Sequence, residues 1–186
     1  ESQTGIWLEE RIRFDTDEFS VAIYNMPFLC RLYDEHNLSI QQLKQALQLV
    51  VKKHESLRTS LVFDHENNQL MQNIIDLNDN DNDLFVFIES TFETDEELTF
   101  IMHDERQNSQ HFDLARGLVF RCHIVYYKKP VSIDHLCDKD VIIFNFHHAL
   151  FDFTSMDIFL RDLNQAYSTG QLRKDDDTLL RYIDCQ

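Results

Sequence analysis

The chain has 186 residues, of which 43% are hydrophobic and 12% aromatic, so it is too apolar for a disordered segment and long enough for one domain with a sizeable core. Its net charge of −16 disfavours binding to nucleic acid or to an anionic membrane, and no run approaches the roughly 20 apolar residues that span a bilayer. The cysteines form no CxxC pair, which argues against a zinc site and favours reduced thiols in a cytoplasmic protein. Because the chain opens on Glu1, we expect it to be part of a longer protein.

The first half of the chain predicts a capped helix followed by a hairpin. Ser39 and Gln42 form a capping-box pattern, and apolar residues then recur at helical spacing, which predicts a helix over 40–54. Residues 57–75 predict two strands around a polar turn. The acidic stretch 76–83 is expected to be a solvated loop. A calcium-binding loop is the alternative, although the glycine and terminal glutamate of an EF-hand are missing.

The second half alternates predicted strands and helices. Strands are expected at 83–90, 118–127 and 141–148, because these runs are rich in β-branched and aromatic residues. Capping patterns at Thr94 with Glu97 and at Thr154 with Asp157 predict helices that run to about Ser109 and to residue 169. The elements together predict a mixed α/β (α+β) layer structure with helices packed on a sheet.

Two adjacent histidines end the last predicted strand, in the segment HHALFDFTS (147–155). Because strand side chains alternate, His147 and His148 should point to opposite sides and hold different roles. Imidazole exchanges protons near neutrality, so a general-base site is one interpretation, and a pair of structural histidines is the other. Asp152 could orient a histidine or pair with an arginine. A metal site is disfavoured because adjacent strand residues diverge.

The histidine segment resembles the HHxxxDGxS signature of condensation domains in nonribosomal peptide synthetases, which belong to the chloramphenicol-acetyltransferase-like superfamily. Four companion segments are also similar to this family and occur in its order. They are SQTGIWLEE followed by YNMPFLCRL, KKHESLRTSLVF (family RHExLRTxF), HFDLARGLVFR (family FDLxxGPLxR) and LLRYIDCQ (family YxDYAxWQ). Lys53 stands where the family usually has Arg, and Leu118 stands where it has Pro.

The resemblance implies a chloramphenicol-acetyltransferase-like half-domain with a mixed sheet. Residues 1–175 would form the amino-terminal subdomain, and 176–186 would begin the link to a missing carboxy-terminal subdomain. In the family, donor and acceptor peptidyl carrier proteins bring thioesters on phosphopantetheine arms into a tunnel between the halves. A peptide bond then forms without a metal or a bound cofactor. The isolated half is therefore expected to be inactive.

Two other functions remain open at this point. One is a condensation-like docking module that binds carrier proteins or tailoring enzymes without chemistry. The other is a related acyltransferase that uses coenzyme A or a carrier thioester. The LRT and FDL segments favour the condensation branch over the coenzyme A enzymes.

The resemblance also implies roles for single residues. His148 matches the catalytic histidine, which accepts the amine proton or holds the amine by a hydrogen bond. His147 matches a largely structural histidine. Asp152 matches an aspartate that pairs with the arginine of the LRT segment, here Arg58, and supports the loop. Ser155 matches the serine of the signature and is expected to support the site.

Phe153 departs from the family, which has glycine at this position. We expect the ring either to turn into the core or to crowd the route to His148, because phenylalanine cannot adopt the unusual dihedrals that glycine allows. The site would then work with altered substrate access, be degenerate, or serve only recognition.

Overall fold

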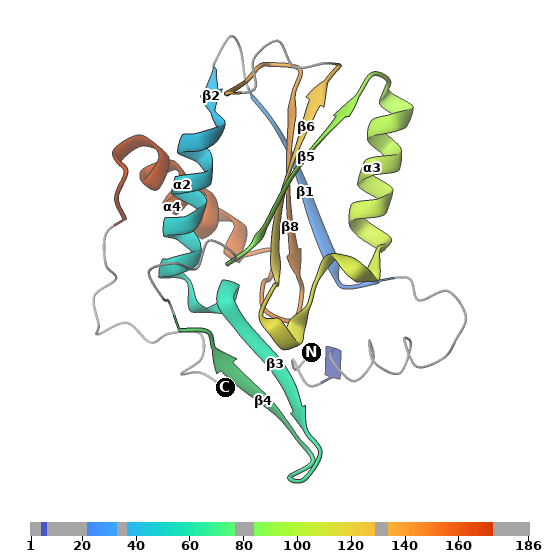
Figure 1. The fold of residues 1–186 in the computed structure, drawn as a ribbon, viewed down its shortest axis with the longest axis vertical. Helices are drawn as coiled ribbons and strands as arrows, with labels where there is room; N and C mark the ends of the chain where they lie inside the picture. Colours follow the sequence, from blue (N-terminus) through green and yellow to red (C-terminus); the bar gives the residue numbers. More distant parts are fainter. Residues whose placement is uncertain (1–4, 7–21, 33–36, 77–83, 129–133, 173–186) are drawn as a thin grey trace.

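The computed structural model describes residues 5–6, 22–32, 37–76, 84–128 and 134–172. Their centre is a four-stranded sheet with the order β1-β8-β6-β5 (Figure 1). The strands are β1 (Asn25–Arg31), β5 (Val86–Phe92), β6 (Phe120–Tyr127) and β8 (Val141–His147). β8 pairs antiparallel with β1 and with β6, whereas β5 and β6 are parallel. The predicted mixed sheet is therefore confirmed.

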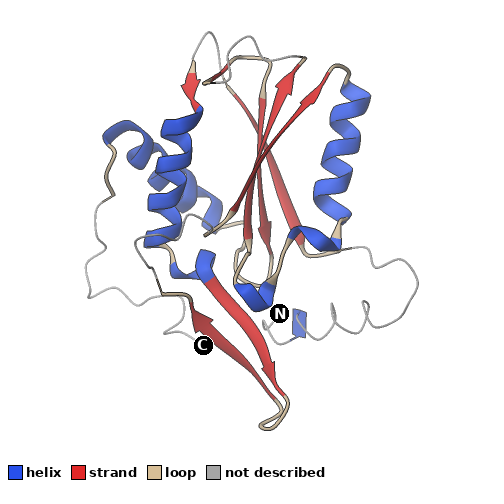
Figure 2. Cartoon of the chain, in the orientation of Figure 1, coloured by secondary structure: helices blue, strands red, loops and turns tan. Residues whose placement is uncertain are grey.

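Helices cover both faces of this sheet (Figure 2). α2 (Ile40–Lys53) and α4 (Ser155–Thr169) contact each other on one face, and α3 (Asp95–Gln107) lies on the other. β8 is buried along its whole length because it is central and covered on both sides. None of the helices in these described ranges is long and apolar enough to cross a bilayer.

The remaining elements are short or lie apart from the main sheet. The predicted hairpin is confirmed as β3 (Thr59–Asp64) and β4 (Gln69–Ile74), and it projects from the body of the molecule (Figure 1). β2 (Leu38–Ser39) pairs with β7 (His135–Leu136). Within the described residues, three 3-10 turns connect the elements: Glu55–Arg58, Ser109–His111 and Leu114–Arg116.

Side-chain hydrogen bonds join the start of α2 to the end of α4. The Ser39 hydroxyl accepts from the backbone N–H of Gln42 at 3.4 Å, as the capping pattern predicts. The amide side chain of Gln42 instead donates to the carbonyl of Tyr167 at 3.0 Å, and the Tyr167 hydroxyl accepts from the Ser39 N–H at 2.9 Å. The reciprocal half of the capping box is thus replaced by a contact between the two helices.

A buried carboxylate joins α3 to the sheet on the opposite face. Glu105 is 0% exposed, and its oxygens accept hydrogen bonds from His123 at 2.7 Å, Asn145 at 2.9 Å and Arg121 at 3.0 Å. A buried charge is tolerated when it is paired and hydrogen-bonded in this way. This network fixes α3 against the two central strands.

Several sequence predictions fall outside the described residues. They are the loop over 77–83, the proposed link over 176–186, and most or all of the segments SQTGIWLEE and LLRYIDCQ.

Candidate functional site

His147 is a buried residue at the end of β8. It is 2% exposed, and its Nδ1 accepts a hydrogen bond from the Ala149 N–H at 3.2 Å. The rings of Tyr24 and Phe112 lie 6.3 and 5.7 Å from its own, measured between centroids. The ring therefore helps to shape the turn after β8 and is closed to a substrate.

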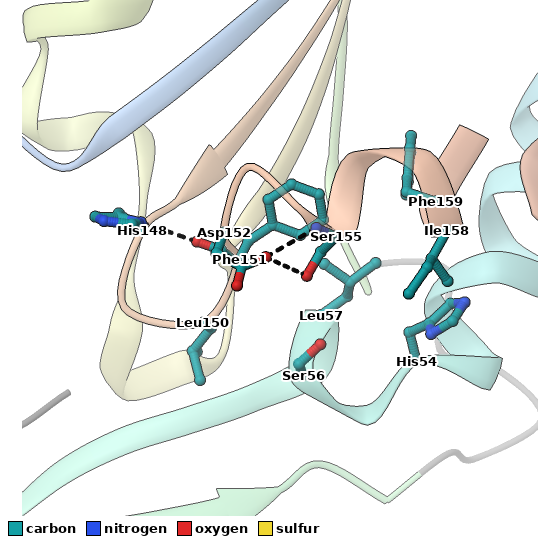
Figure 3. Close-up of a pocket in the computed structure, with 10 residues that line it drawn as sticks. All are labelled: His54, Ser56, Leu57, His148, Leu150, Phe151, Asp152, Ser155, Ile158 and Phe159. Carbon is teal, nitrogen blue, oxygen red and sulfur yellow. Dashed lines mark hydrogen bonds between the residues drawn. The ribbon is translucent and has the colours of Figure 1, made fainter. Parts of the chain in front are cut away.

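His148 lies in that turn, is exposed, and is one of the residues that line a cavity, with its ring at the edge of this set on the side away from His54 (Figure 3). Its Nδ1 is 3.0 Å from the carbonyl oxygen of Phe151. A carbonyl oxygen only accepts hydrogen bonds, so Nδ1 must carry the proton. Nε2 of the neutral ring is then the nitrogen that can accept a proton or a hydrogen bond from a substrate. The two adjacent imidazoles thus have different environments, as the strand alternation predicts.

The carbonyl that orients His148 is itself held by the core. The Phe151 side chain is 7% exposed, and its ring stacks on that of Phe146 with centroids 3.8 Å apart. Phe146 is fully buried in β8. The orientation of the imidazole therefore depends on aromatic packing beneath the loop.

The cavity has a volume of about 250 Å³ and is formed by three segments of the chain. These are the turn after α2, the loop after β8 and the first part of α4 (Figure 3). The lining residues are His54, Ser56, Leu57, His148, Leu150, Phe151, Asp152, Ser155, Ile158 and Phe159. No three His, Cys, Asp or Glu side chains of the described ranges are grouped as metal ligands would be.

Asp152 caps the first turn of α4. Its Oδ1 accepts hydrogen bonds from the N–H and hydroxyl of Ser155, at 2.8 and 2.6 Å, and from the hydroxyl of Thr154 at 2.9 Å. The hydrogen bond from the Ser155 hydroxyl is the main cause that lowers the pKa of Asp152. Thr154 has helical backbone angles and its side chain makes no capping bond, so the predicted pairing of Thr154 with Asp157 is wrong. Asp152 performs that role because it precedes Ser155 by three residues.

The structure does not bring Arg58 and Asp152 together. Arg58 is 8% exposed; its Nη1 donates to the Ile75 carbonyl at 2.7 Å, and its Nη2 lies 3.7 Å from a carboxylate oxygen of Glu55. Asp152 is exposed, and its carboxylate accepts a hydrogen bond from the N–H of Ser155, the first residue of α4. Arg58 and Asp152, both of which the structure describes, therefore do not form the ion pair that the resemblance implies. Arg58 instead holds the end of the hairpin.

Phe153 does not turn into the core, which was one of the two positions expected for it. Its side chain is 74% exposed, and its ring lies 5.9 Å from that of Phe28, between centroids. It is not among the residues that line the cavity. Its φ is not in the left-handed region, so this backbone does not require glycine. Phenylalanine is accommodated because the ring packs outward on β1.

Sequence reasoning missed an ionic cluster behind the cavity wall. Asp162 is 1% exposed, and its Oδ2 accepts from His54 Nε2 at 2.9 Å and from Lys53 Nζ at 2.8 Å. Its Oδ1 accepts from Arg161 Nε at 3.1 Å. Burial acts to raise the pKa of Asp162, but the hydrogen bonds from Lys53, His54 and Arg161 outweigh it, and the net effect is a lowered pKa. The available signal was Asp162 itself, an acidic residue beside Leu163 within the last predicted helix.

The Condensation domain family model matches residues 1–184 of the chain. Surfactin synthase subunit 1 of Bacillus subtilis (strain 168) is 32% identical over 164 residues, which cover 87% of the chain and 4% of the relative. A polyketide synthase-nonribosomal peptide synthetase of Aspergillus clavatus is 29% identical over 182 residues, which cover 98% and 4%. The chain thus spans a few per cent of the length of these curated relatives.

Solved structures share the fold. The starter condensation domain of rhizomide synthetase RzmA superposes with a TM-score of 0.64 at 14% identity, over 98% of this chain and 40% of that one. The epimerization domain from the third module of tyrocidine synthetase B gives 0.65 at 21%, over 91% and 36%. The X-domain in its complex with OxyB from teicoplanin biosynthesis gives 0.65 at 24%, over 98% and 35%.

Proposed function

The chain belongs to the condensation-domain family, and from this premise we propose that it is the amino-terminal subdomain of a condensation domain in a cytoplasmic nonribosomal peptide synthetase. Residues 1–175 are the subdomain, and 176–186 begin the link to a carboxy-terminal subdomain. The coverage of 40% or less of the solved neighbours supports this division. The reaction joins a donor thioester to the amine of an acceptor aminoacyl thioester. Both are carried on phosphopantetheine arms of carrier proteins, and no further cofactor takes part.

The free Nε2 of His148 is the observation that carries this proposal. The acceptor amine attacks the thioester carbonyl carbon, a C–N bond forms, and the C–S bond breaks to release a thiolate. The proton that the nitrogen loses passes to Nε2 of His148 and from there to the thiolate sulfur. General-base assistance of this kind contributes about 10²–10⁴-fold, and positioning of an already activated thioester supplies a further share.

The neighbouring residues support the loop that presents His148. His147 shapes the turn from within the core, and Asp152 with Ser155 fixes the start of α4. Arg58 acts on the hairpin beside the cavity. Each of these residues positions the site without touching the reacting atoms.

The test uses the full-length protein that contains this chain, with loaded donor and acceptor carriers. We expect His148→Ala to lower kcat for amide formation by about 10²–10⁴-fold. His111→Asn is the matched control, because His111 makes a bond of 2.9 Å to Asp104 away from the cavity, and it should keep full turnover. Full turnover of His148→Ala would refute the role of that residue. The isolated chain of 186 residues should form no amide.

A docking module is the second candidate, because Phe153 stands exposed where the family has glycine. One solved neighbour of the same fold is described as a complex of an X-domain with OxyB. If wild type and Phe153→Gly both form no amide while the protein binds carriers, docking is the function. If only Phe153→Gly is active, the native site is degenerate.

A further inference from the structure

A second imidazole lies on the cavity wall, apart from His148. His54 follows the last residue of α2 and opens the turn that leads to β3. It lines the same cavity as His148, and the two rings lie at opposite ends of the set of lining side chains (Figure 3). The proposed reaction assigns no role to His54.

The hydrogen bond to Asp162 decides which nitrogen of His54 faces a ligand. The Asp162 carboxylate also binds Lys53 and Arg161, so it is ionised and can only accept hydrogen bonds. His54 Nε2, which is 2.9 Å from it, therefore carries a proton. Nδ1 of the neutral ring is then a hydrogen-bond acceptor. The roles of the two nitrogens are exchanged in His148, where Nδ1 makes the hydrogen bond and Nε2 is the acceptor.

The residues that line the cavity favour a hydrogen-bond donor as the group that His54 binds. Among the described residues, those that line the cavity include no lysine or arginine, so a phosphate or carboxylate would find no fixed cation there. Half of them are apolar: Leu57, Leu150, Phe151, Ile158 and Phe159. An uncharged N–H group on a narrow, extended substrate fits a cavity that has two imidazole acceptors and a lining that is half apolar. A carrier-borne substrate has N–H groups of this kind in its amine and in the amides of phosphopantetheine.

We infer that His54 is a positioning residue whose Nδ1 accepts a hydrogen bond from an N–H group of the carrier-borne substrate, and that Asp162 fixes the ring for this task. The inference rests on the proposed condensation function. It places one contact at each end of the cavity. His148 meets the reacting amine, while His54 holds the arm so that the amine reaches His148.

Two substitutions separate this role from a purely structural one. The amide of glutamine reaches the place of Nε2, so His54→Gln keeps a bond to Asp162 and leaves no acceptor at the place of Nδ1. The shorter asparagine has the opposite effect, because its oxygen replaces Nδ1 while the bond to Asp162 is lost. His111→Asn is again the control, since it removes an imidazole–carboxylate bond of 2.9 Å outside the cavity. Measurements on the full-length protein are kcat, KM for each loaded carrier in turn, and the melting temperature.

We expect His54→Gln to raise KM for one of the two carriers by about 3- to 10-fold with a smaller change in kcat, as the loss of one hydrogen bond predicts. The carrier whose KM rises identifies the arm that His54 holds. His54→Asn should keep KM near wild type despite a lower melting temperature. The inference is overturned if His54→Gln has the wild-type KM for both carriers, or if His54→Asn is the more impaired in KM. If wild type and His111→Asn form no amide, the proposed function itself fails, and this inference fails with it.

Discussion

Replacing Glu105 by glutamine should reduce the loss of unfolding free energy that this chain shows as the pH falls below 6. Glu105 is fully buried, and burial by itself acts to raise its pKa. The hydrogen bonds from His123 and Asn145 and the charge of Arg121 outweigh burial and lower the pKa from 4.5 to about 2. The folded state therefore binds the Glu105 proton more weakly than the unfolded chain does.

This difference determines the sign and size of the effect. A lowered carboxyl pKa contributes stability that is fully present above the unfolded value of 4.5 and is lost as the pH falls towards about 2. At about 1.4 kcal/mol per pH unit, the full contribution is about 3 kcal/mol. Of this, about 2 kcal/mol should disappear between pH 6 and pH 3. Glu105→Gln has no proton to bind and should lack this slope, although it lowers stability at pH 6.

Urea unfolding followed by circular dichroism at pH 6, 5, 4 and 3 measures the slope. Glu66→Gln is the control, because Glu66 is exposed in the β3–β4 turn and should keep the wild-type slope. The reasoning is refuted if the free energy of unfolding of wild type and Glu105→Gln falls equally over this range.

Three further changes test the local geometry by the same unfolding measurements and by amide formation. Gly117→Ala should cost about 1 kcal/mol more than Gly170→Ala, because both have positive φ but only the Cβ at Gly117 would meet the end of the Ile75 side chain and lie 3.3 Å from the Ser60 backbone nitrogen; equal costs would contradict this. Asp152→Ala should cost about 1 kcal/mol, as expected for a lost helix cap, and a loss of 3 kcal/mol or more would point to a buried ion pair instead. Phe153→Gly should leave the rate of amide formation in the full-length protein unchanged, since the ring lies outside the cavity; a faster variant would show that it obstructs access.

The elements of the fold were largely predictable because their signals are local. Ser39 and Thr94 sit one residue before their helices and accept hydrogen bonds from the predicted N–H groups. Gly170 ends α4 with a φ of 66°, as a C-terminal glycine should. The pairing order of the strands had no such signal, because it depends on contacts between distant segments. The sequence therefore predicted a sheet without predicting that β8 would be central.

The candidate site was predictable only in part. Strand alternation separated His147 from His148, and the structure gives them different surroundings. The partner of Asp152 was predicted from a resemblance, and it is wrong because a helix N-terminus three residues away competes more directly. His54 and Asp162 were missed, since their bond spans 108 residues of sequence. No periodicity or local spacing reports such a contact.

The pairing of β1 with β8 has a consequence for how the protein is made. Met26 lies opposite Phe146, so the pairing of β1 with β8 joins two segments that are far apart in the sequence and closes the chain between them into a long loop. The entropy of such closure is recovered only when the contacts on both sides form. β1 thus has to wait on the ribosome until the chain has grown past β8. The completed sheet and the loop that carries His148 should then form together in one late step of folding.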